Sequence, residues 1–242
     1  MKNILDIKNL SYSFGSNPIL KDINIHVNEN EMVAIVGSSG VGKSTLFNLI
    51  AGVLKKQTGE ITINGSDDYI GKVAYMLQKD LLFEHKTIIN NVILPLIIAK
   101  VDKKEALEEG NKILKQFNLD RYANKYPQQL SGGMRQRVAL IRTYMFKRKI
   151  FLLDEAFSAL DAITKKELHK WYLDLKKEFN LTTLLITHDI EEAVFLSDRI
   201  YILGNKPGEI IGEIKIEINP NEDIDVQRLF YKKEILNIMN IE

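Results

Sequence analysis

Residues 37–45 read Gly-Ser-Ser-Gly-Val-Gly-Lys-Ser-Thr, and they follow the uninterrupted apolar run Met-Val-Ala-Ile-Val at 32–36. Such a run predicts a buried strand of a parallel sheet, because these strands are covered on both faces. The glycines allow a tight turn whose backbone N–H groups point inward, and a lysine and a hydroxyl residue then begin a helix. Strand, loop and helix signals therefore coincide in the order that a phosphate-binding loop requires.

This loop predicts that the chain binds a nucleoside triphosphate. We expect Lys43 to reach the terminal phosphates and the hydroxyl of Ser44 to ligate Mg²⁺. The alternative is a glycine-rich turn with a chance lysine, and the coincidence of three signals disfavours it. The residues assigned to the triphosphate are Gly37, Ser38, Ser39, Gly40, Val41, Gly42, Lys43, Ser44 and Thr45.

Composition narrows the class of protein. Of the 242 residues, 45% are hydrophobic and 27% charged, which is typical of a globular chain with its own core. The 33 basic residues balance 32 acidic ones, so the overall charge of the chain does not attract it to nucleic acid. The absence of cysteine excludes disulfides, thiolate zinc sites and cysteine nucleophiles.

No segment of the sequence has the pattern of a signal peptide or a membrane span. The most apolar run, at 92–99, has eight residues and contains a proline, whereas a spanning helix needs about 20 residues. We therefore expect a cytoplasmic protein that reaches a membrane only through a partner.

The pattern of apolar residues changes along the chain. Alternation in the first thirty residues, around a turn at 15–18, predicts an antiparallel hairpin, and short strands are expected at 60–63 and 73–77. Helical periodicity follows, with Met134, Val138, Ile141 and Met145 on one helical face. From residue 150 strands and helices alternate, which implies parallel strands joined by crossover helices.

Together these patterns predict an α/β fold with the core of a P-loop NTPase, in which helices flank a mixed sheet. An antiparallel β subdomain and an inserted α-helical subdomain are added to this core. We interpret 1–242 as a single domain, with a core lobe at about 1–78 and 148–218 and a helical lobe at about 79–147. A short helical tail is expected at 219–242, where residues 223–241 have an amphipathic pattern.

Two carboxylates follow the apolar strand predicted at 150–153. Asp154 and Glu155 would lie at its carboxyl end, where open α/β sheets bind their ligands. We expect Asp154 to hold the Mg²⁺ shell and Glu155 to act as general base toward the attacking water. A solvated acidic strand end is the alternative, and the nearby phosphate loop weakens it.

The segment 130–137, Leu-Ser-Gly-Gly-Met-Arg-Gln-Arg, resembles the signature motif of ATP-binding cassette (ABC) ATPases. Other landmarks of that family follow in order: Phe14 for adenine stacking, Gln78 in the Q-loop, residues 158–161 with Asp161 as the D-loop, and His188 as the switch histidine. The resemblance covers about residues 4–218. It implies that Gln78 completes the metal and water environment and that His188 contacts the γ-phosphate. Alternatively, Gln78 or His188 has only a structural role. Tyr12 competes with Phe14 as the stacking aromatic.

The resemblance also implies partners. In this family the signature motif closes on the γ-phosphate held by the opposite subunit, so Ser131, Gly132 and Gly133 would complete the ATP site of a second copy. Their position at a helix amino terminus offers N–H groups and the positive end of the helix dipole. A head-to-tail dimer would then enclose two ATP molecules. Transmembrane permease subunits and, indirectly, a solute-binding protein are the further partners implied.

Departures from the family pattern point to a subgroup. Met134 replaces a common glutamine and Ala156 a common proline, and neither removes a group that the chemistry needs. The first departure occurs in import ATPases of the nitrate, sulfonate and taurine group, which the chain also resembles at 197–203 and 206–210. An ATPase subunit for import of a sulfonate, nitrate or a vitamin or pyrimidine precursor is thus implied.

Other functions are weighed against this one. An exporter subunit is the nearest rival, and a cassette ATPase of DNA repair or translation comes next. A switch GTPase needs an Asn-Lys-x-Asp motif, and both 124–127 and 205–208 lack its aspartate.

The segment after Gln78 suggests a docking surface. Residues 79–84, Lys-Asp-Leu-Leu-Phe-Glu, place three large apolar side chains in a loop that we expect to be exposed. Exposed apolar clusters often mark interaction surfaces. The resemblance implies that a short helix of the permease docks in this region. The alternative is that Leu82 and Phe83 pack under the helical lobe.

Overall fold

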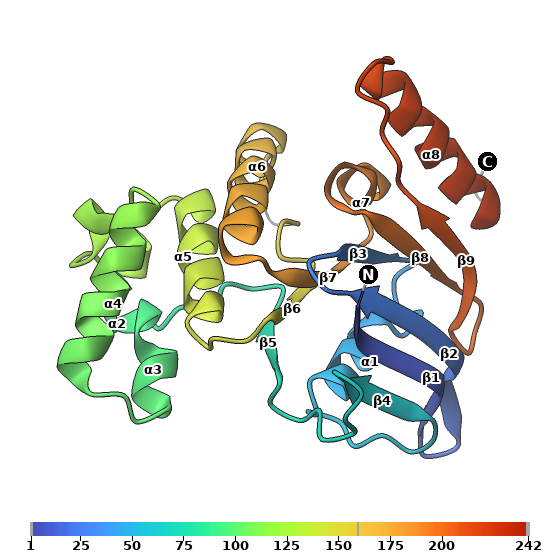
Figure 1. Ribbon diagram of the computed structural model, residues 1–242, viewed down its shortest axis with the longest axis horizontal. Coiled ribbons are helices and arrows are strands. Elements are labelled where there is room, and N and C mark those ends of the chain that lie inside the picture. The colour runs from blue at the N-terminus through green and yellow to red at the C-terminus, as the bar shows by residue number, and fades with distance from the viewer. Residues whose placement is uncertain (1, 159, 241–242) are drawn as a thin grey trace.

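The computed structural model describes residues 2–158 and 160–240. The helical segment 88–144 lies at one end of the long axis, and the sheets lie toward the other end (Figure 1). The central sheet has six strands. In spatial order they are β5 (Val73–Met76), β6 (Ile150–Asp154), β7 (Thr182–Thr187), β3 (Met32–Val36), β8 (Arg199–Gly204) and β9 (Glu209–Lys215). The strands from β5 to β8 run parallel, and β9 is antiparallel to β8.

Complete burial of β3, β6 and β7 explains their uninterrupted apolar sequences. Helix α6 (Ala162–Phe179) connects β6 to β7, and α7 (Ile190–Leu196) connects β7 to β8. Helix α1 (Lys43–Ile50) follows β3. The carboxyl ends of β3, β6 and β7 are adjacent, because Val36 pairs with Thr187 and Asp154 with Ile186. This edge of the sheet collects the polar residues that follow each strand.

A second, antiparallel sheet has the order β2-β1-β4, formed by β1 (Asn3–Phe14), β2 (Asn17–Asn28) and β4 (Glu60–Ile63). The hairpin predicted for the first thirty residues is thereby confirmed. Alternate residues of β1 and β2 pack with α1 and one face of the central sheet in a common apolar cluster. That contact fixes α1 and the loop before it between two sheets.

The segment between β5 and β6 is mostly helical. It contains α2 (Ile88–Val92), α3 (Leu94–Ile98), α4 (Lys103–Gln116), the 3₁₀ turns η1 (Asp120–Tyr122) and η2 (Pro127–Gln129), and α5 (Gly132–Tyr144). The predicted apolar face of α5 is correct, since Val138, Ile141 and Met145 are buried. Residues 79–87 form a loop, so the helices of this segment begin later than the sequence pattern suggested.

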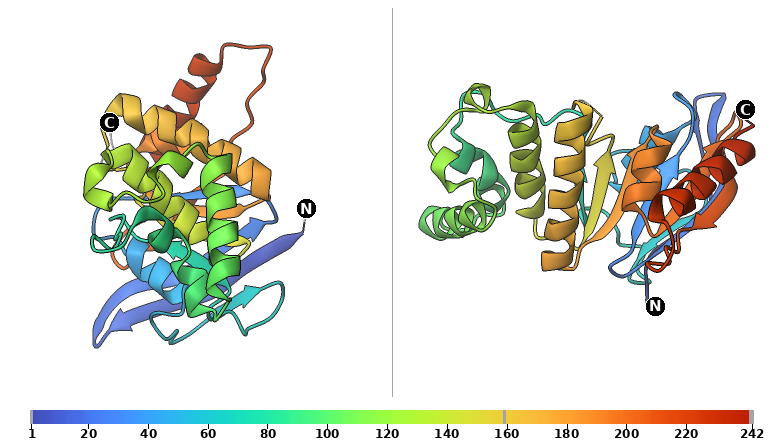
Figure 2. Two further views of the ribbon diagram at one scale, coloured as in Figure 1. Left: turned by 90° about the vertical axis from the view of Figure 1, so that its left-hand side faces the viewer. Right: turned by 90° about the horizontal axis from the view of Figure 1, so that it is seen from above.

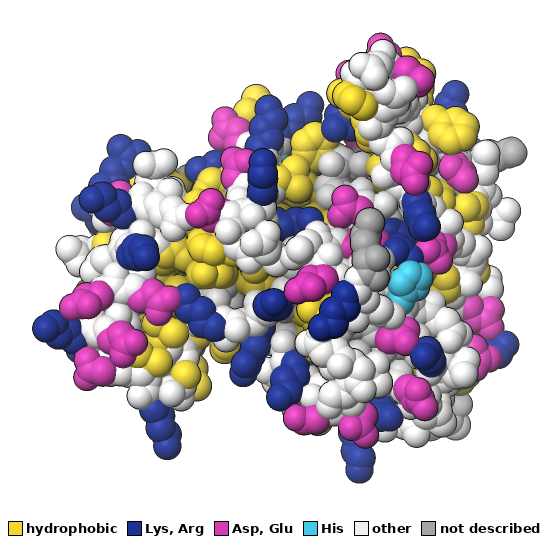
Figure 3. All heavy atoms as spheres, in the orientation of Figure 1, with side chains coloured by type: hydrophobic (Ala, Val, Ile, Leu, Met, Phe, Trp, Pro, Cys, Tyr) yellow, Lys and Arg dark blue, Asp and Glu magenta, His cyan; other side chains and the backbone are white. Residues whose placement is uncertain are grey.

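The C-terminal helix α8 (Ile224–Ile238) lies beside α7 and β9, as the right-hand view in Figure 2 shows. Asp223 caps its amino end, and Ile235 is buried in a small cluster with residues of β3, α7 and β8. On the face seen in Figure 3, basic and acidic side chains are interspersed, in agreement with the balanced composition. None of the helices in the described residues is long and apolar enough to cross a membrane.

Candidate active site

The loop 37–42 connects β3 to α1 and is packed closely on its neighbours. Gly40 and Gly42 have φ of 76° and 111°, a backbone conformation that favours glycine. A Cβ on Gly37 would lie 2.3 Å from the carbonyl oxygen of Leu203, and one on Gly208 would lie 2.3 Å from that of Val41. Glycine at 208, which the sequence analysis did not assign to the site, therefore supports the phosphate loop from outside.

Lys43 is buried, and its ammonium lies inside the loop. The Nζ atom donates hydrogen bonds to the carbonyl oxygens of Gly37, at 2.8 Å, and Ser38, at 2.9 Å. Burial lowers the pKa of Lys43, while the charges of Glu155 and Asp154 act to raise it. Since an ammonium has three protons, one donor remains for a phosphate oxygen.

Asp154 lies at the end of β6 and is also buried. The hydroxyl of Tyr75, on the adjacent strand β5, donates to its Oδ2 atom at 3.1 Å. Burial raises the pKa of Asp154, although hydrogen bonds from Tyr75 and Ser44 act to lower it. A cation at this carboxylate would compensate for the cost of burying its charge.

Ser44, Asp154 and Gln78 supply the hard oxygen ligands that Mg²⁺ prefers. The hydroxyl of Ser44 and the carboxylate of Asp154 are already neighbours. Gln78 uses its amide nitrogen in a hydrogen bond, which leaves the carbonyl oxygen available. The described residues contain no cluster of three or more His, Cys, Asp or Glu side chains able to hold a metal, and Mg²⁺ beside a nucleotide needs only one or two protein carboxylates. The donor set therefore fits the ion.

Glu155 follows Asp154 and brings the remaining predicted groups together. Its Oε2 atom accepts a hydrogen bond from Nε2 of Gln78 at 3.0 Å, and its Oε1 atom lies 3.3 Å from Nδ1 of His188. The backbone of Glu155 has φ of 48°, which is rare for a residue other than glycine. It is held there because its N–H bonds to Ile186 and its carbonyl accepts two hydrogen bonds from Ser158.

Burial distinguishes the two aromatic residues at the end of β1 that compete as the adenine-stacking residue. Tyr12 is 8% exposed and packs in the core, whereas Phe14 is 51% exposed. The two rings meet edge to face, with 5.0 Å between centroids. Of the two rings, Phe14 is therefore the one exposed enough to stack on a nucleotide base. Its contact with adenine stays a prediction.

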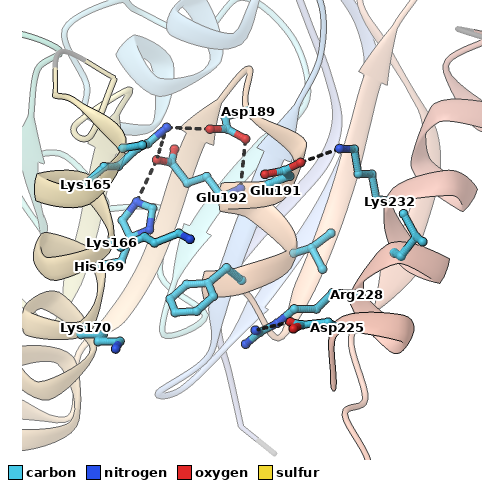
Figure 4. A pocket seen from close by; sticks show the side chains of 14 residues that line it. Lys165, Lys166, His169, Lys170, Asp189, Glu191, Glu192, Asp225, Arg228 and Lys232 are labelled. Carbon is cyan, nitrogen blue, oxygen red and sulfur yellow. Dashed lines mark hydrogen bonds and ion pairs between the residues drawn. The ribbon is translucent and has the colours of Figure 1, made fainter. Parts of the chain in front are cut away.

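Charged residues of α6 and α7 contact Asp189, the residue that follows His188 in the chain (Figure 4). Asp189 caps α7 through the backbone N–H of Glu192, and its Oδ2 atom accepts a hydrogen bond from Nζ of Lys165 at 2.6 Å. The side chain of Glu192 is 1% exposed and lies 3.3 Å from Lys165 and 3.0 Å from Nε2 of His169. These groups line a pocket of about 620 Å³ between α6, α7 and α8.

The signature residues lie on a different part of the chain. Ser131 caps α5 by accepting from the N–H of Met134, and a Cβ on Gly133 would lie 2.5 Å from Thr164 of α6. Asp161 caps α6, accepting from Ile163 and Thr164 at 3.1 Å, and Ala159 of the same predicted D-loop lies outside the described residues. Among the described residues, no hydrogen bond or ion pair joins 131–133 to the loop 37–42.

A family model described as ABC transporter matches residues 20–158, more than half of the chain. The chain belongs to this family. It is 39% identical to the formylaminopyrimidine import ATP-binding protein ThiZ of Halalkalibacterium halodurans, over 97% of this chain and 96% of that relative. It is 37% identical to the nitrate import ATP-binding protein NrtD of Synechocystis sp., over 93% of this chain and 87% of that relative.

Solved structures of ABC proteins have the same fold. The protein cbiO1 from Clostridium perfringens, part of the transporter complex cbiONQ, superimposes with a TM-score of 0.83 at 26% identity, over 100% of this chain and 96% of cbiO1. The cassette MJ0796, in a dimer bound to ADP and phosphate, gives a TM-score of 0.74 at 33% identity, over 89% of this chain and all of MJ0796. The chain is thus an ABC ATPase that binds ATP, and the predicted fold class is confirmed.

Within this ABC ATPase, several supporting residues were missed by sequence reasoning. The hydroxyl of a part-buried tyrosine such as Tyr75 needs a partner, but the place of β5 beside β6, and with it the contact to Asp154, is evident only from the sheet order. Lys165 and His169 gave no signal, since charged residues on a helix more often face solvent. Their partners become evident only when α6 is placed against α7.

Proposed function

We propose that this chain is the ATP-hydrolysing subunit of an ABC importer and works as a head-to-tail dimer on a membrane permease. The observation that carries the proposal is the convergence of Glu155, Gln78 and His188 beside Asp154 and Lys43, at the carboxyl edge of the central sheet. Phosphoryl transfer to water needs a base, a positioned phosphate and compensation of charge, and these residues supply all three.

Each residue has a distinct part in the reaction. The N–H groups of loop 37–42 and the ammonium of Lys43 bind the phosphates. Mg²⁺, held by Ser44, Asp154 and Gln78, would neutralise charge on the transferred group. Glu155 accepts the proton of the attacking water, while His188 and Gln78 orient its carboxylate and the γ-phosphate.

A second copy would complete each site. Ser131 and the N–H groups at the start of α5 form an anion site that lies away from loop 37–42 of the same chain. Two copies arranged head to tail bring this site onto the γ-phosphate of the partner. Asp161 and the D-loop lie beside it, since Gly133 packs on the first turn of α6. The dimer found for MJ0796 supports this arrangement.

Import of a small solute fits the relatives that match along almost their whole length. Two of them are named for import of formylaminopyrimidine and of nitrate. For this chain we infer a solute of that size, such as a sulfonate, nitrate or a pyrimidine precursor, delivered by a separate solute-binding protein. The subunit would lie on the cytoplasmic face of the membrane, attached through the permease.

The loop after Gln78 is the proposed docking surface for the permease. Leu81 is 53% exposed and Phe83 is 43% exposed, so both are accessible. Leu82 is only 6% exposed, and the expectation that all three apolar side chains face solvent is wrong. Leu82 packs in the core beneath the helices, which anchors the loop, while its two neighbours point outward.

The test compares Phe83→Asp with Phe146→Asp, a control at another exposed phenylalanine just beyond α5. Each variant is co-expressed with its permease and purified through a tag on the permease. Phe83→Asp should lose co-purification and solute uptake while keeping ATP affinity and thermal stability near those of the unmodified chain. Intact assembly of Phe83→Asp, or equal loss in Phe146→Asp, would remove this surface from the proposal.

A further inference from the structure

The loop that follows Gln78 is attached to the signature helix by two arginines of α5. Arg135 donates from Nε to Oδ2 of Asp80 at 2.8 Å and from Nη2 to Oδ1 at 3.1 Å, and it also bonds Glu84 at 2.7 Å. Arg142, two turns further along, donates to the carbonyl oxygens of Leu81 at 2.8 Å and Asp80 at 2.6 Å. Five hydrogen bonds therefore join residues 80–84 to α5.

The contact between Arg135 and Asp80 is of the strong kind. A planar guanidinium that donates two parallel hydrogen bonds to a carboxylate fixes both distance and orientation. Both side chains are largely removed from solvent. Burial acts to raise the pKa of Asp80, but the hydrogen bonds from Arg135 and the backbone of Leu82 hold it below its ordinary value. With Leu82 buried beneath, the loop and α5 form one rigid unit.

One end of this unit lies next to the signature residues, and the other end lies next to Gln78. Arg135 is one turn after Ser131, and its N–H bonds to the carbonyl of Ser131 at 2.9 Å. Asp80 lies two residues after Gln78, which contacts the proposed base Glu155. The exposed side chains of Leu81 and Phe83 lie between the bonded positions. A displacement of the loop must therefore displace the amino end of α5.

We propose that Arg135 is a positioning residue that locks loop 80–84 to the signature helix. Through this lock, a force on the loop at its permease side moves Ser131–Gly133 relative to the ATP of the partner subunit. The inference rests on the proposed dimer and on the proposed docking surface. Arg135 itself makes no contact with ATP in this arrangement, whereas the neighbouring signature residues Ser131–Gly133 would contact the ATP of the partner subunit.

A purely structural role would predict a different outcome. If Arg135 only stabilised the fold, Arg135→Met and Asp80→Asn would lower the unfolding temperature and alter nothing else. If it positions the signature motif, both variants should weaken the ATP-bound dimer while ATP binding by the monomer is unchanged. Asp80→Asn is a mild change, because the amide oxygen can still accept from the N–H of Leu82.

The experiment measures dimerisation with ATP in a Glu155→Gln background, using Arg135→Met, Asp80→Asn and the double variant. Arg121→Met is the control, since this exposed arginine of the helical segment makes no hydrogen bond or ion pair with 80–84 among the described residues. Each single variant should weaken dimerisation about 3- to 30-fold, and the double variant no further. Arg135→Lys should restore only part of the loss, because an ammonium lacks the planar fork that donates two parallel hydrogen bonds to a carboxylate.

Hydrogen exchange provides an arm that needs no dimer. In the monomer, Asp80→Asn should raise exchange in α5 as well as in residues 79–86, because loop and helix are one unit. Wild-type dimer affinity in Arg135→Met, additive losses in the double variant, or exchange confined to the loop would each overturn the inference. Absence of an ATP-dependent dimer in the unmodified background would instead count against the proposed function, and exchange would still decide the role of Arg135.

Discussion

The carboxylate of Glu155 lies 3.3 Å from the Nδ1 atom of His188, although the two residues follow different strands. The contact arises because β6 and β7 are neighbours, with Asp154 paired to Ile186, so that the residues just beyond them meet. Gln78 reaches the same carboxylate from β5. Three consecutive strands of the sheet thus converge on one candidate base.

Replacing His188 by alanine should reduce ATP hydrolysis by roughly 10²-fold or more, because an orienting group at the reacting phosphate is lost. ATP affinity should change little, since Lys43 and the loop 37–42 are untouched. Steady-state hydrolysis and binding of a fluorescent ATP analogue measure the two effects. His85→Ala is the control, as His85 is exposed in another loop. Equal activity in the two variants would exclude the assigned role.

Lys165→Met should lower turnover through the loop of His188. The change removes the cation that bonds Asp189 at 2.6 Å and leaves the buried carboxylate of Glu192 with His169 alone. We expect a fall in kcat on the order of 10-fold with an unchanged KM for ATP. Lys166→Met, at the exposed neighbouring position, should behave as the unmodified protein. Only four histidines are present, so the NMR signal of the His188 ring can be followed directly.

Lys43→Ala and Ser131→Arg should fail at different steps. The first removes a phosphate contact and should weaken ATP binding by the monomer. The second obstructs only the surface offered to the partner and should leave monomer binding intact while abolishing the ATP-dependent dimer. Equilibrium binding and size-exclusion chromatography with ATP separate these defects. A Ser131→Arg protein that dimerises and hydrolyses ATP normally would contradict the composite site.

The ion pair of Asp80 predicts how stability depends on pH. The pKa of Asp80 in the folded chain is lower than its ordinary value of 3.8, so the unfolded chain binds the proton more readily. Its contribution to the free energy of unfolding is therefore complete above that value and is lost as pH falls through the folded pKa. The stability difference between the unmodified chain and Asp80→Asn should be constant from about pH 5 to 7 and shrink below about pH 4. Urea unfolding at several pH values measures it, and a difference that grows on acidification would contradict the ion pair.

Features encoded in contiguous residues were predictable from the sequence. The apolar run before the glycine loop, the alternation in the first thirty residues and the apolar face at 134–145 gave β3, the β1–β2 hairpin and helix α5 correctly. The supporting contacts were not predictable, because Tyr75 with Asp154 and Arg135 with Asp80 join segments that are distant in sequence. Leu82 was wrongly placed on the surface because three consecutive apolar residues in a loop do not show which side chain faces the core.

The most direct test of the account concerns the base. Glu155→Gln preserves the shape of the side chain and removes both its charge and its ability to accept a proton. Loss of a general base typically costs about 10² to 10⁴ in rate. The variant should bind ATP as the unmodified chain does, hydrolyse it at least about 10²-fold more slowly, and accumulate as an ATP-bound dimer in size-exclusion chromatography. Hydrolysis at the unmodified rate, with no accumulation of dimer, would contradict the role of Glu155 and with it the proposed mechanism.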